Sequence, residues 1–282
     1  MDKWKQRLLH LHHCPAITRS ILSKILQIDP DLKNILHFTT NELTHYLGLS
    51  QTSSEKIKTQ IKHTNLEKLL KKYDTEAIFP ITMNDPQYPR LLKEIFDPPY
   101  ILYCKGDISL LYSKKISVVG TRKPTMYGKN VLEYILPHLV DKGYTVVSGL
   151  AIGVDTFAHE ITIDKKGKTI AILGSGLLNV YPKQNNILAE TIGRYHLLVS
   201  EYPPYTPPQR WYFPQRNRII SGLSTGTLIV EAKERSGSLI TAEQALEQGR
   251  EVFAIPGSIF SPSSAGTNFL IQQGAKLTMK IE

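Results

Sequence analysis

The sequence predicts an α/β fold in which a largely parallel sheet carries helices on both faces and follows a small all-helical domain. Two observations lead to this prediction. From about residue 76 onward, short apolar runs alternate with helical segments, which is the pattern of a parallel sheet with helical crossovers. Before that point, apolar residues recur at three- and four-residue spacing, as they do in short amphipathic helices.

Residues 1–75 form the predicted helical accessory domain, with helix breaks near Pro15, Pro30 and Gly48. Proline and glycine at such points end a helix or start a turn. The stretch from Leu43 to Ile61 has LGLS in its middle. It fits a helix-hairpin-helix, a module that often touches the DNA backbone, and it equally fits part of a compact bundle used for spacing or protein contact.

Residues 76–282 form the second predicted domain. Its lead-in, Ile81–Asp107, is rich in Asp-Pro and Tyr-Pro pairs, and we expect it to wrap the sheet edge irregularly. The predicted strands are Ile116–Val119, Tyr144–Val147, Thr169–Leu173, His196–Val199, Thr227–Val230 and Glu251–Ile255. The predicted helices are Gly128–Val140, Val154–Ile163, Asn185–Tyr195, Pro214–Leu223, Thr241–Gln248 and Thr267–Gln273.

Composition indicates an ordinary globular protein, with 41% hydrophobic and 21% charged residues. No apolar stretch is long enough to span a membrane, and the N-terminus does not resemble a secretory signal. Cys14 and Cys104 lie far apart and form no CxxC pair, so neither a disulfide framework nor a thiolate metal site is expected. The sequence therefore predicts a soluble cytoplasmic protein without a membrane partner.

The positive charge, formally +9, is segregated along the chain. Three windows, residues 108–132, 165–189 and 202–230, contain no Asp or Glu and hold 12 of the Lys and Arg residues. Clustered cations favour polyanionic partners such as nucleic acid.

Glycine-rich turns follow the predicted strands. In open α/β sheets, ligands bind beyond the carboxyl ends of the strands, and helix N-termini there offer N–H groups to anions. Four such turns together predict a shelf of anion-binding donors, with Thr241 in the N-cap region of the last helix. The candidate residues are Gly120, Thr121 and Arg122, then Ser148 and Gly149, then Gly174, Ser175, Gly176 and the later Lys183, and finally Ser236, Gly237 and Ser238.

Residues 202–218, YPPYTPPQRWYFPQRNR, combine prolines, aromatic side chains and three arginines without a nearby acid. Aromatic faces stack on unpaired bases while Arg and Lys follow the phosphates, so this stretch favours single-strand binding. Alternatively, the aromatic residues attach the loop to the core. Arg216 and Arg218 diverge by roughly 200° on a helix, so we expect at least one to point inward unless the pair lies at the helix start.

Several motifs are excluded. Gly222–Gly226 matches GxSxG, but a helix precedes it and a strand follows, the reverse of a nucleophile elbow. Asp155 and His159 stand four residues apart without a third ligand, which favours a capping Asp and a packed His. Neither a dinucleotide fingerprint nor an NTPase phosphate loop is present. We expect no catalytic residue, no metal and no cofactor.

Taken in order, the motifs resemble the DNA processing protein A family (DprA, also called Smf), recombination mediators of natural transformation. The resemblance covers about residues 80–278 and rests on seven segments. These are VVGTRKPTMYG, VVSGLAIGVDTFAH, AILGSGLLNVYPKQN, LLVSEYPP, FPQRNRIISGLS, VEAKERSGSLITAEQALEQGREVFAIPG and GTNFLIQQGA.

The resemblance implies a Rossmann-like core, homodimerisation, single-stranded DNA binding in a basic pocket, and loading of the RecA recombinase onto that strand. It also implies that Arg122 and Lys183 contact phosphates and that Arg216, Asn217 and Arg218 match a family RNR element. The winged-helix domain that ends some members is not expected here. Phe269–Ile271 could support a dimer contact, although three adjacent helical residues cannot share one face.

Two other functions stay open at this point. A nucleotide-hydrolysing enzyme is suggested by GTLIVE at residues 226–231, which faintly resembles the PGGxGTxxE loop of lysine-decarboxylase-lookalike proteins but lacks the double glycine. A purely structural scaffold would show no salt-sensitive retention of single strands.

Overall fold

The computed structural model describes residues 1–280, and the chain divides into two compact units, residues 1–77 and 78–282. The first unit is helical and the second is built on one mixed sheet with helices on both faces. The predicted fold class is therefore confirmed. Because each unit has its own core, each is described separately below.

Five helices make up residues 1–77. Each begins at a side-chain cap, for example Asp2, which accepts the N–H of Lys5, and Thr39, which forms a capping box with Glu42. Such caps satisfy N–H groups that have no partner within the helix. The apolar sides meet in a core that includes Leu9, Ile25 and Ile57. The helices are α1 Lys3–His12, α2 Arg19–Ile28, α3 Thr40–Leu47, α4 Gln51–His63 and α5 Leu66–Thr75.

A short turn joins α3 to α4 within Leu43–Ile61, as both alternatives considered for this stretch require. Helix α3 ends at Gly48, which adopts a left-handed conformation with φ of 65°, and α4 begins three residues later behind the N-cap Ser50. Glycine adopts this conformation without the steric cost that a Cβ atom brings. The buried residues Leu43, Leu47 and Ile57 lie on this pair of helices.

The second unit carries a sheet whose strand order is β1-β2-β6-β5-β4-β3-β7-β8-β9. Strands β3 to β9 run parallel where they pair, whereas β1 and β2 are antiparallel additions at one edge. The strands are β1 Ile78–Thr82, β2 Ile101–Gly106, β3 Lys115–Gly120, β4 Thr145–Ser148, β5 Lys168–Leu173, β6 Leu197–Ser200, β7 Gly226–Val230, β8 Glu251–Ala254 and β9 Lys276–Leu277.

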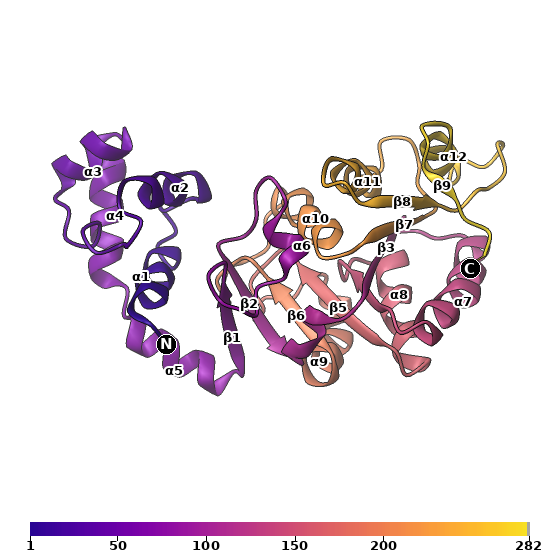
Figure 1. The fold of residues 1–282 in the computed structure, drawn as a ribbon, viewed down its shortest axis with the longest axis horizontal. Coiled ribbons are helices and arrows are strands. Elements are labelled where there is room, and N and C mark those ends of the chain that lie inside the picture. The colour runs from indigo at the N-terminus through magenta and orange to yellow at the C-terminus, as the bar shows by residue number, and fades with distance from the viewer. Residues whose placement is uncertain (281–282) are drawn as a thin grey trace. The chain divides into compact units, whose positions relative to one another are not determined.

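Two hydrophobic clusters fill the two faces of the sheet. One is formed largely with α10, α11 and α12 and includes Ile219, Ala242 and Leu270; the other, with α7 and α8, includes Leu136 and Ala158 (Figure 1). The helices and short 3₁₀ turns are α6 Arg90–Lys93, η1 Ile108–Tyr112, α7 Met126–Asp141, α8 Val154–Asp164, η2 Lys183–Asn185, α9 Asn186–Tyr195, α10 Tyr212–Gly222, α11 Gly237–Glu247 and α12 Ala265–Gln272.

The structure corrects two details of the sequence-based description. The lead-in at 81–107 is not irregular throughout, because it contains the last two residues of β1 and all of β2. These two strands pair with Ile81 opposite Leu102. Helix α11 starts at Gly237 behind the N-cap Ser236, four residues earlier than predicted, and Thr241 is buried inside it.

Candidate functional site

The strand order places the predicted glycine-rich turns side by side. Strands β5, β4, β3 and β7 are consecutive neighbours in the sheet and all run in the same direction. Their carboxyl ends therefore share one edge, and adjacent ends are separated by about 4.8 Å. The four turns at 174–176, 148–153, 120–122 and 231–236 follow these ends. We call this region the strand-end edge.

The glycines at this edge mostly make room for the protein itself. A Cβ atom on Gly149 would overlap the Arg216 guanidinium, and one on Gly174 would lie 2.8 Å from the Phe213 ring. On Gly120 and Gly176 it would meet backbone carbonyls of residues 230 and 203. Only Gly237 among these five has nothing within 4 Å of that position. Of these five glycines, only Gly237 therefore leaves open space through which a ligand could approach the backbone.

Two carboxylates of the protein bind amides in two of the four predicted turn regions. The Asp155 carboxylate accepts the N–H groups of Gly149 and Ala151 at 3.1 and 3.4 Å. Glu231 accepts the N–H of Thr125 at 2.8 Å as well as its hydroxyl. Asp155 lies in the first turn of α8, where the helix dipole favours negative charge, and Glu231 holds Thr125, the N-cap residue of α7. Amides in these two turns are thus engaged internally, which corrects the predicted shelf of free donors.

Arg216 is buried beneath the edge at 4% exposure. Its guanidinium donates to the carbonyl oxygens of Gly149 and Ile172, at the ends of β4 and β5. Burial lowers the pKa of Arg216 to about 10, opposed by Asp155 and assisted by Arg122. Burial raises the pKa of Asp155, and Arg216 opposes that shift. Arg216 therefore supports the turns from inside.

Arg218 is also buried, and the expectation that it lacks acidic neighbours is wrong. It donates to Glu201 and to Asp97 at 2.6 Å each. Burial alone would lower the pKa of Arg218, but these two carboxylates outweigh that effect and raise it. The sequence could not indicate this pairing, because Asp97 lies 121 residues away. Between the two arginines, Asn217 is partly exposed and its side-chain amide donates to the Gly237 carbonyl at 3.4 Å.

Two predicted cations do face solvent at the strand-end edge. Arg122 and Lys183 are exposed, and neither forms an ion pair within residues 1–280. The turn between β4 and α8 lies between their segments. On one side Gly153 touches the Arg122 backbone; on the other, Asn185 donates to the Leu150 carbonyl and the Thr156 hydroxyl, both at 2.9 Å.

The predicted hydroxyl residues serve local structure. Ser148 donates to the Val118 carbonyl at 2.6 Å, and Ser175 donates to the Asn179 carbonyl at 2.7 Å. Ser236 and Ser238 share a hydrogen bond of 2.8 Å at the α11 start. Thr121 is partly exposed and its N–H donates to the Glu231 carbonyl at 2.8 Å. These groups hold the shape of the turns that present the exposed cations.

The aromatic residues of 202–218 divide between the two roles considered from sequence. Tyr202 stacks on Tyr212 within the segment with ring centroids 3.9 Å apart, and Phe213 packs against Tyr181 of the loop after β5 at 5.4 Å. These rings are therefore engaged within the protein. Trp211 and Tyr205 remain 60% and 47% exposed. Their faces, together with exposed Arg210, are accessible for stacking.

The other candidate motifs have structural roles. His159 is fully buried and its Nδ1 lies 2.7 Å from the Thr169 hydroxyl. No group of three potential metal ligands occurs within residues 1–280. Residues 226–230 form a buried strand in the middle of the sheet rather than a catalytic loop, so the structure gives the nucleotide-hydrolase alternative no support. In the same range, no helix is long and apolar enough to cross a bilayer.

Comparisons with known proteins agree with this architecture. The model of the DNA recombination-mediator protein A family matches residues 79–282. DNA processing protein DprA of Bacillus subtilis is 44% identical over 269 residues, covering 94% of this chain and 89% of that protein. The solved structure of DNA processing protein A from Streptococcus pneumoniae superimposes with a TM-score of 0.85 at 37% identity and covers 99% of this chain and 96% of its own.

A second solved structure, from Helicobacter pylori, concerns the single-stranded DNA binding mode of DNA processing protein A. It superimposes with a TM-score of 0.64 at 33% identity, covering 71% of this chain and 91% of that one.

Proposed function

The chain belongs to the DNA recombination-mediator protein A family, and from that premise we propose that it binds single-stranded DNA without sequence specificity at the strand-end edge. The observation that carries this proposal is the pair Arg122 and Lys183. Both are exposed at one edge of the sheet without ion-pair partners in the described chain, so both are available to phosphates. The Helicobacter pylori relative, whose structure concerns single-stranded DNA binding, supports the same ligand.

The mode of binding follows from which groups are available. Three amides beside the edge, those of Thr125, Gly149 and Ala151, are engaged by Glu231 and Asp155. In the proposed mode, long cationic side chains contact the phosphates instead. Exposed Trp211 and Tyr205 offer π-faces to bases, and base–aromatic stacking tolerates any base. A duplex presents no unpaired base for such stacking. Single strands are therefore preferred over duplexes, and affinity falls with added salt.

A gel shift tests this function directly. Labelled oligo-dT and a duplex of equal length are titrated with the wild-type protein and with Arg122→Glu and Lys183→Glu. We expect retention of the single strand by wild type and at least a tenfold loss of affinity in each variant. Lys142→Glu, an exposed charge reversal at the C-cap of α7, should bind normally. Unchanged affinity in both edge variants would refute the assignment.

Family membership also suggests an assembly role. We propose that the protein is cytoplasmic, forms a homodimer and loads RecA recombinase onto the strand it holds. For the dimer contact we favour Phe269 on α12 and Leu277 on the edge strand β9, which are 53% and 50% exposed. Leu270 is buried and Ile271 packs against the core. Among residues 269–271, only Phe269 is therefore exposed enough for a dimer contact.

Two measurements address these roles. Light scattering during gel filtration should give the mass of two chains for wild type and of one chain for Phe269→Glu. RecA-dependent ATP hydrolysis on a strand precoated with single-strand-binding protein should accelerate when this protein is added. A monomeric wild type would overturn the dimer, and absence of acceleration would overturn the loading role.

A further inference from the structure

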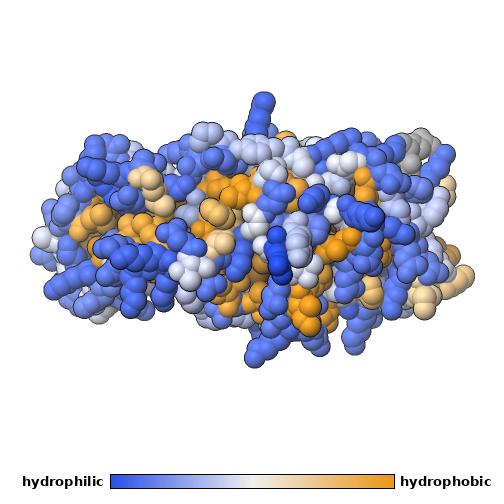
Figure 2. Space-filling model, turned by 90° about the horizontal axis from the view of Figure 1, so that it is seen from below, coloured by the Kyte–Doolittle hydropathy of each residue, from blue (hydrophilic) through white to orange (hydrophobic). Residues whose placement is uncertain are grey.

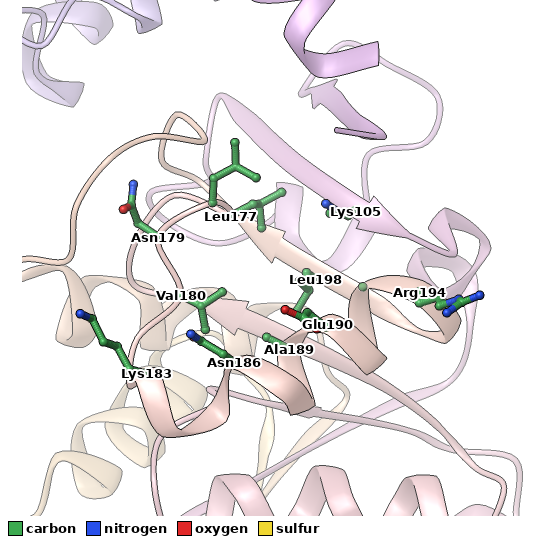
Figure 3. A pocket seen from close by; sticks show the side chains of 12 residues that line it. Lys105, Leu177, Asn179, Val180, Lys183, Asn186, Ala189, Glu190, Arg194 and Leu198 are labelled. Atoms are coloured by element: carbon green, nitrogen blue, oxygen red, sulfur yellow. The ribbon is translucent and has the colours of Figure 1, made fainter. Parts of the chain in front are cut away.

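A pocket of about 590 Å³ lies beside the strand-end edge, along helix α9. Lys183 lines it at one end, while Lys105 and Arg194 lie toward the other (Figure 3). Its size falls within the roughly 300–1,000 Å³ of typical small-ligand sites. The hydrogen bonds described above for the predicted turns do not fill this pocket.

One wall of the pocket is a single face of α9. Asn186, Ala189, Glu190, Gly193 and Arg194 all line it, at the three- and four-residue spacing that puts side chains on one side of a helix. Asn186 and Arg194 are eight positions apart, which at a rise of 1.5 Å per residue corresponds to about 12 Å along the helix. The pocket thus extends away from the strand-end edge, along the helix.

The opposite wall is apolar and the ends are cationic. Leu177 and Val180 come from the loop after β5, and Leu198 comes from β6. Viewed from below, the side on which α9 lies in Figure 1, hydrophobic surface is exposed between hydrophilic residues (Figure 2). Three cations and the single carboxylate of Glu190 line the pocket, and Arg194 forms no ion pair within residues 1–280.

We propose that this pocket takes nucleotides of the same DNA strand, beyond the phosphate held at Lys183, so that single-stranded DNA leaves the strand-end edge along α9. An unpaired base lies against the apolar wall, and a later phosphate reaches Arg194 and Lys105. Apolar walls with cations at both ends complement a chain that alternates bases with phosphates. The inference rests on the proposed function, since Lys183 belongs to both sites.

Gly193 provides a specific way to close the pocket. A Cβ atom there would lie 3.1 Å from Leu198 and 3.7 Å from Lys105, so the side chain of Gly193→Leu would enter the space a base needs. Arg194→Glu instead removes the far phosphate contact. Lys142→Glu is its matched control, because it also reverses a cation at the C-terminal end of a helix.

The test measures affinity for oligo-dT of increasing length by fluorescence anisotropy. We expect Gly193→Leu and Arg194→Glu to bind the shortest oligonucleotides like wild type and to lose the gain in affinity that longer ones show. For Arg194→Glu the loss at 0.1 M salt is at least about fivefold, because a single-strand phosphate contact with a slope of about 0.7 in log K against log salt strengthens binding about fivefold between about 1 M and 0.1 M salt, and the introduced carboxylate also repels the phosphate. Lys142→Glu should follow wild type, and unfolding curves identify any variant that misfolds.

Each outcome decides between the sites. If both pocket variants match wild type at every length while Arg122→Glu abolishes binding, the pocket inference is wrong and the proposed function stands. If wild type binds no oligonucleotide, the proposed function itself fails. A deoxynucleoside monophosphate that binds wild type but not Gly193→Leu, without any effect of this variant on long oligonucleotides, would assign the pocket to a free nucleotide and overturn its place in the DNA path.

Discussion

The side-chain amide of Asn185 donates a hydrogen bond of 2.9 Å to the backbone carbonyl of Leu150. Asn185 is 6% exposed and follows Lys183 by two residues, whereas Leu150 lies in the turn after β4. This contact, together with the one to Thr156, holds the segment that carries Lys183 against the turn after β4. That turn also adjoins Arg122. The geometry of the proposed interface therefore depends on a side chain that need not touch DNA.

Replacing this amide should affect both stability and binding. Asn185→Leu keeps the approximate size but leaves the Leu150 carbonyl without its donor, which costs about 1–3 kcal/mol of unfolding free energy. We expect weaker binding of oligo-dT as well, because Lys183 loses its support. Urea unfolding and anisotropy measure the two effects. Gln184→Leu, at an exposed neighbouring position, is the control; equal behaviour of the two variants would contradict the role given to Asn185.

The salt dependence of binding should report the exposed cations. Arg122→Ala and Lys183→Ala each remove one phosphate contact, so the slope of log K against log salt should become shallower by about 0.7 for each. Anisotropy titrations from about 50 to 200 mM salt supply the slope, within the range in which such contacts change affinity strongly. A slope identical to that of wild type would mean that the substituted cation does not contact phosphate.

The buried Arg218 should matter to stability. Arg218→Ala would leave Glu201, only 12% exposed at its side chain, without its cation. Breaking a buried ion pair from one side typically costs about 3–5 kcal/mol. We expect a loss of unfolding free energy of that order in urea. The double variant Arg218→Met with Glu201→Gln removes both charges and should recover part of the loss; no recovery would argue against the ion pair as its cause.

Acid should destabilise the second unit through His159. Burial, with smaller contributions from His196 and Arg216, lowers the pKa of His159 from 6.5 to about 3. Because the unfolded chain then binds a proton that the folded chain does not, stability falls as the pH drops from 6.5 toward 3, by about 1.4 kcal/mol per pH unit.

A variant isolates that contribution from those of other groups. His159→Leu cannot take up the proton, so its unfolding free energy should depend less steeply on pH in this interval than that of wild type. The pKa of His12 and of His13 is also lowered mainly by burial, to about 3 and about 4, but both lie in the first unit and are unchanged in the variant. Parallel pH profiles of the two proteins would contradict the assignment.

The sequence predicted the repeating part of the fold well, because hydrophobic periodicity reports local structure. The six predicted strands correspond to β3–β8, with ends that differ by at most one residue. The strands β1 and β2 were missed because Pro80 and the surrounding Pro-containing turns disguise an antiparallel edge pair. Edge strands tolerate proline, since one side of each makes no ladder hydrogen bonds.

At the candidate site, the sequence predicted the glycine-rich turns but not the side chains that pack against them. That Gly149 accommodates Arg216 depends on a contact across 67 residues, and no local pattern contains such information. The angular separation of Arg216 and Arg218 indicated that at least one points inward. Both do, because α10 buries each of them at the sheet: one meets the carbonyls at the strand ends, and the other meets carboxylates of two separate loops.

The internal capping of the turns by Asp155 and Glu231 has a kinetic consequence. A ligand held by rigid backbone amides must sit in one register, whereas long Arg and Lys side chains can follow a phosphate through several positions. A strand gripped in this way can slip by one nucleotide while its other contacts persist. We therefore expect a strand bound in the proposed way to shift register along the strand-end edge without dissociating.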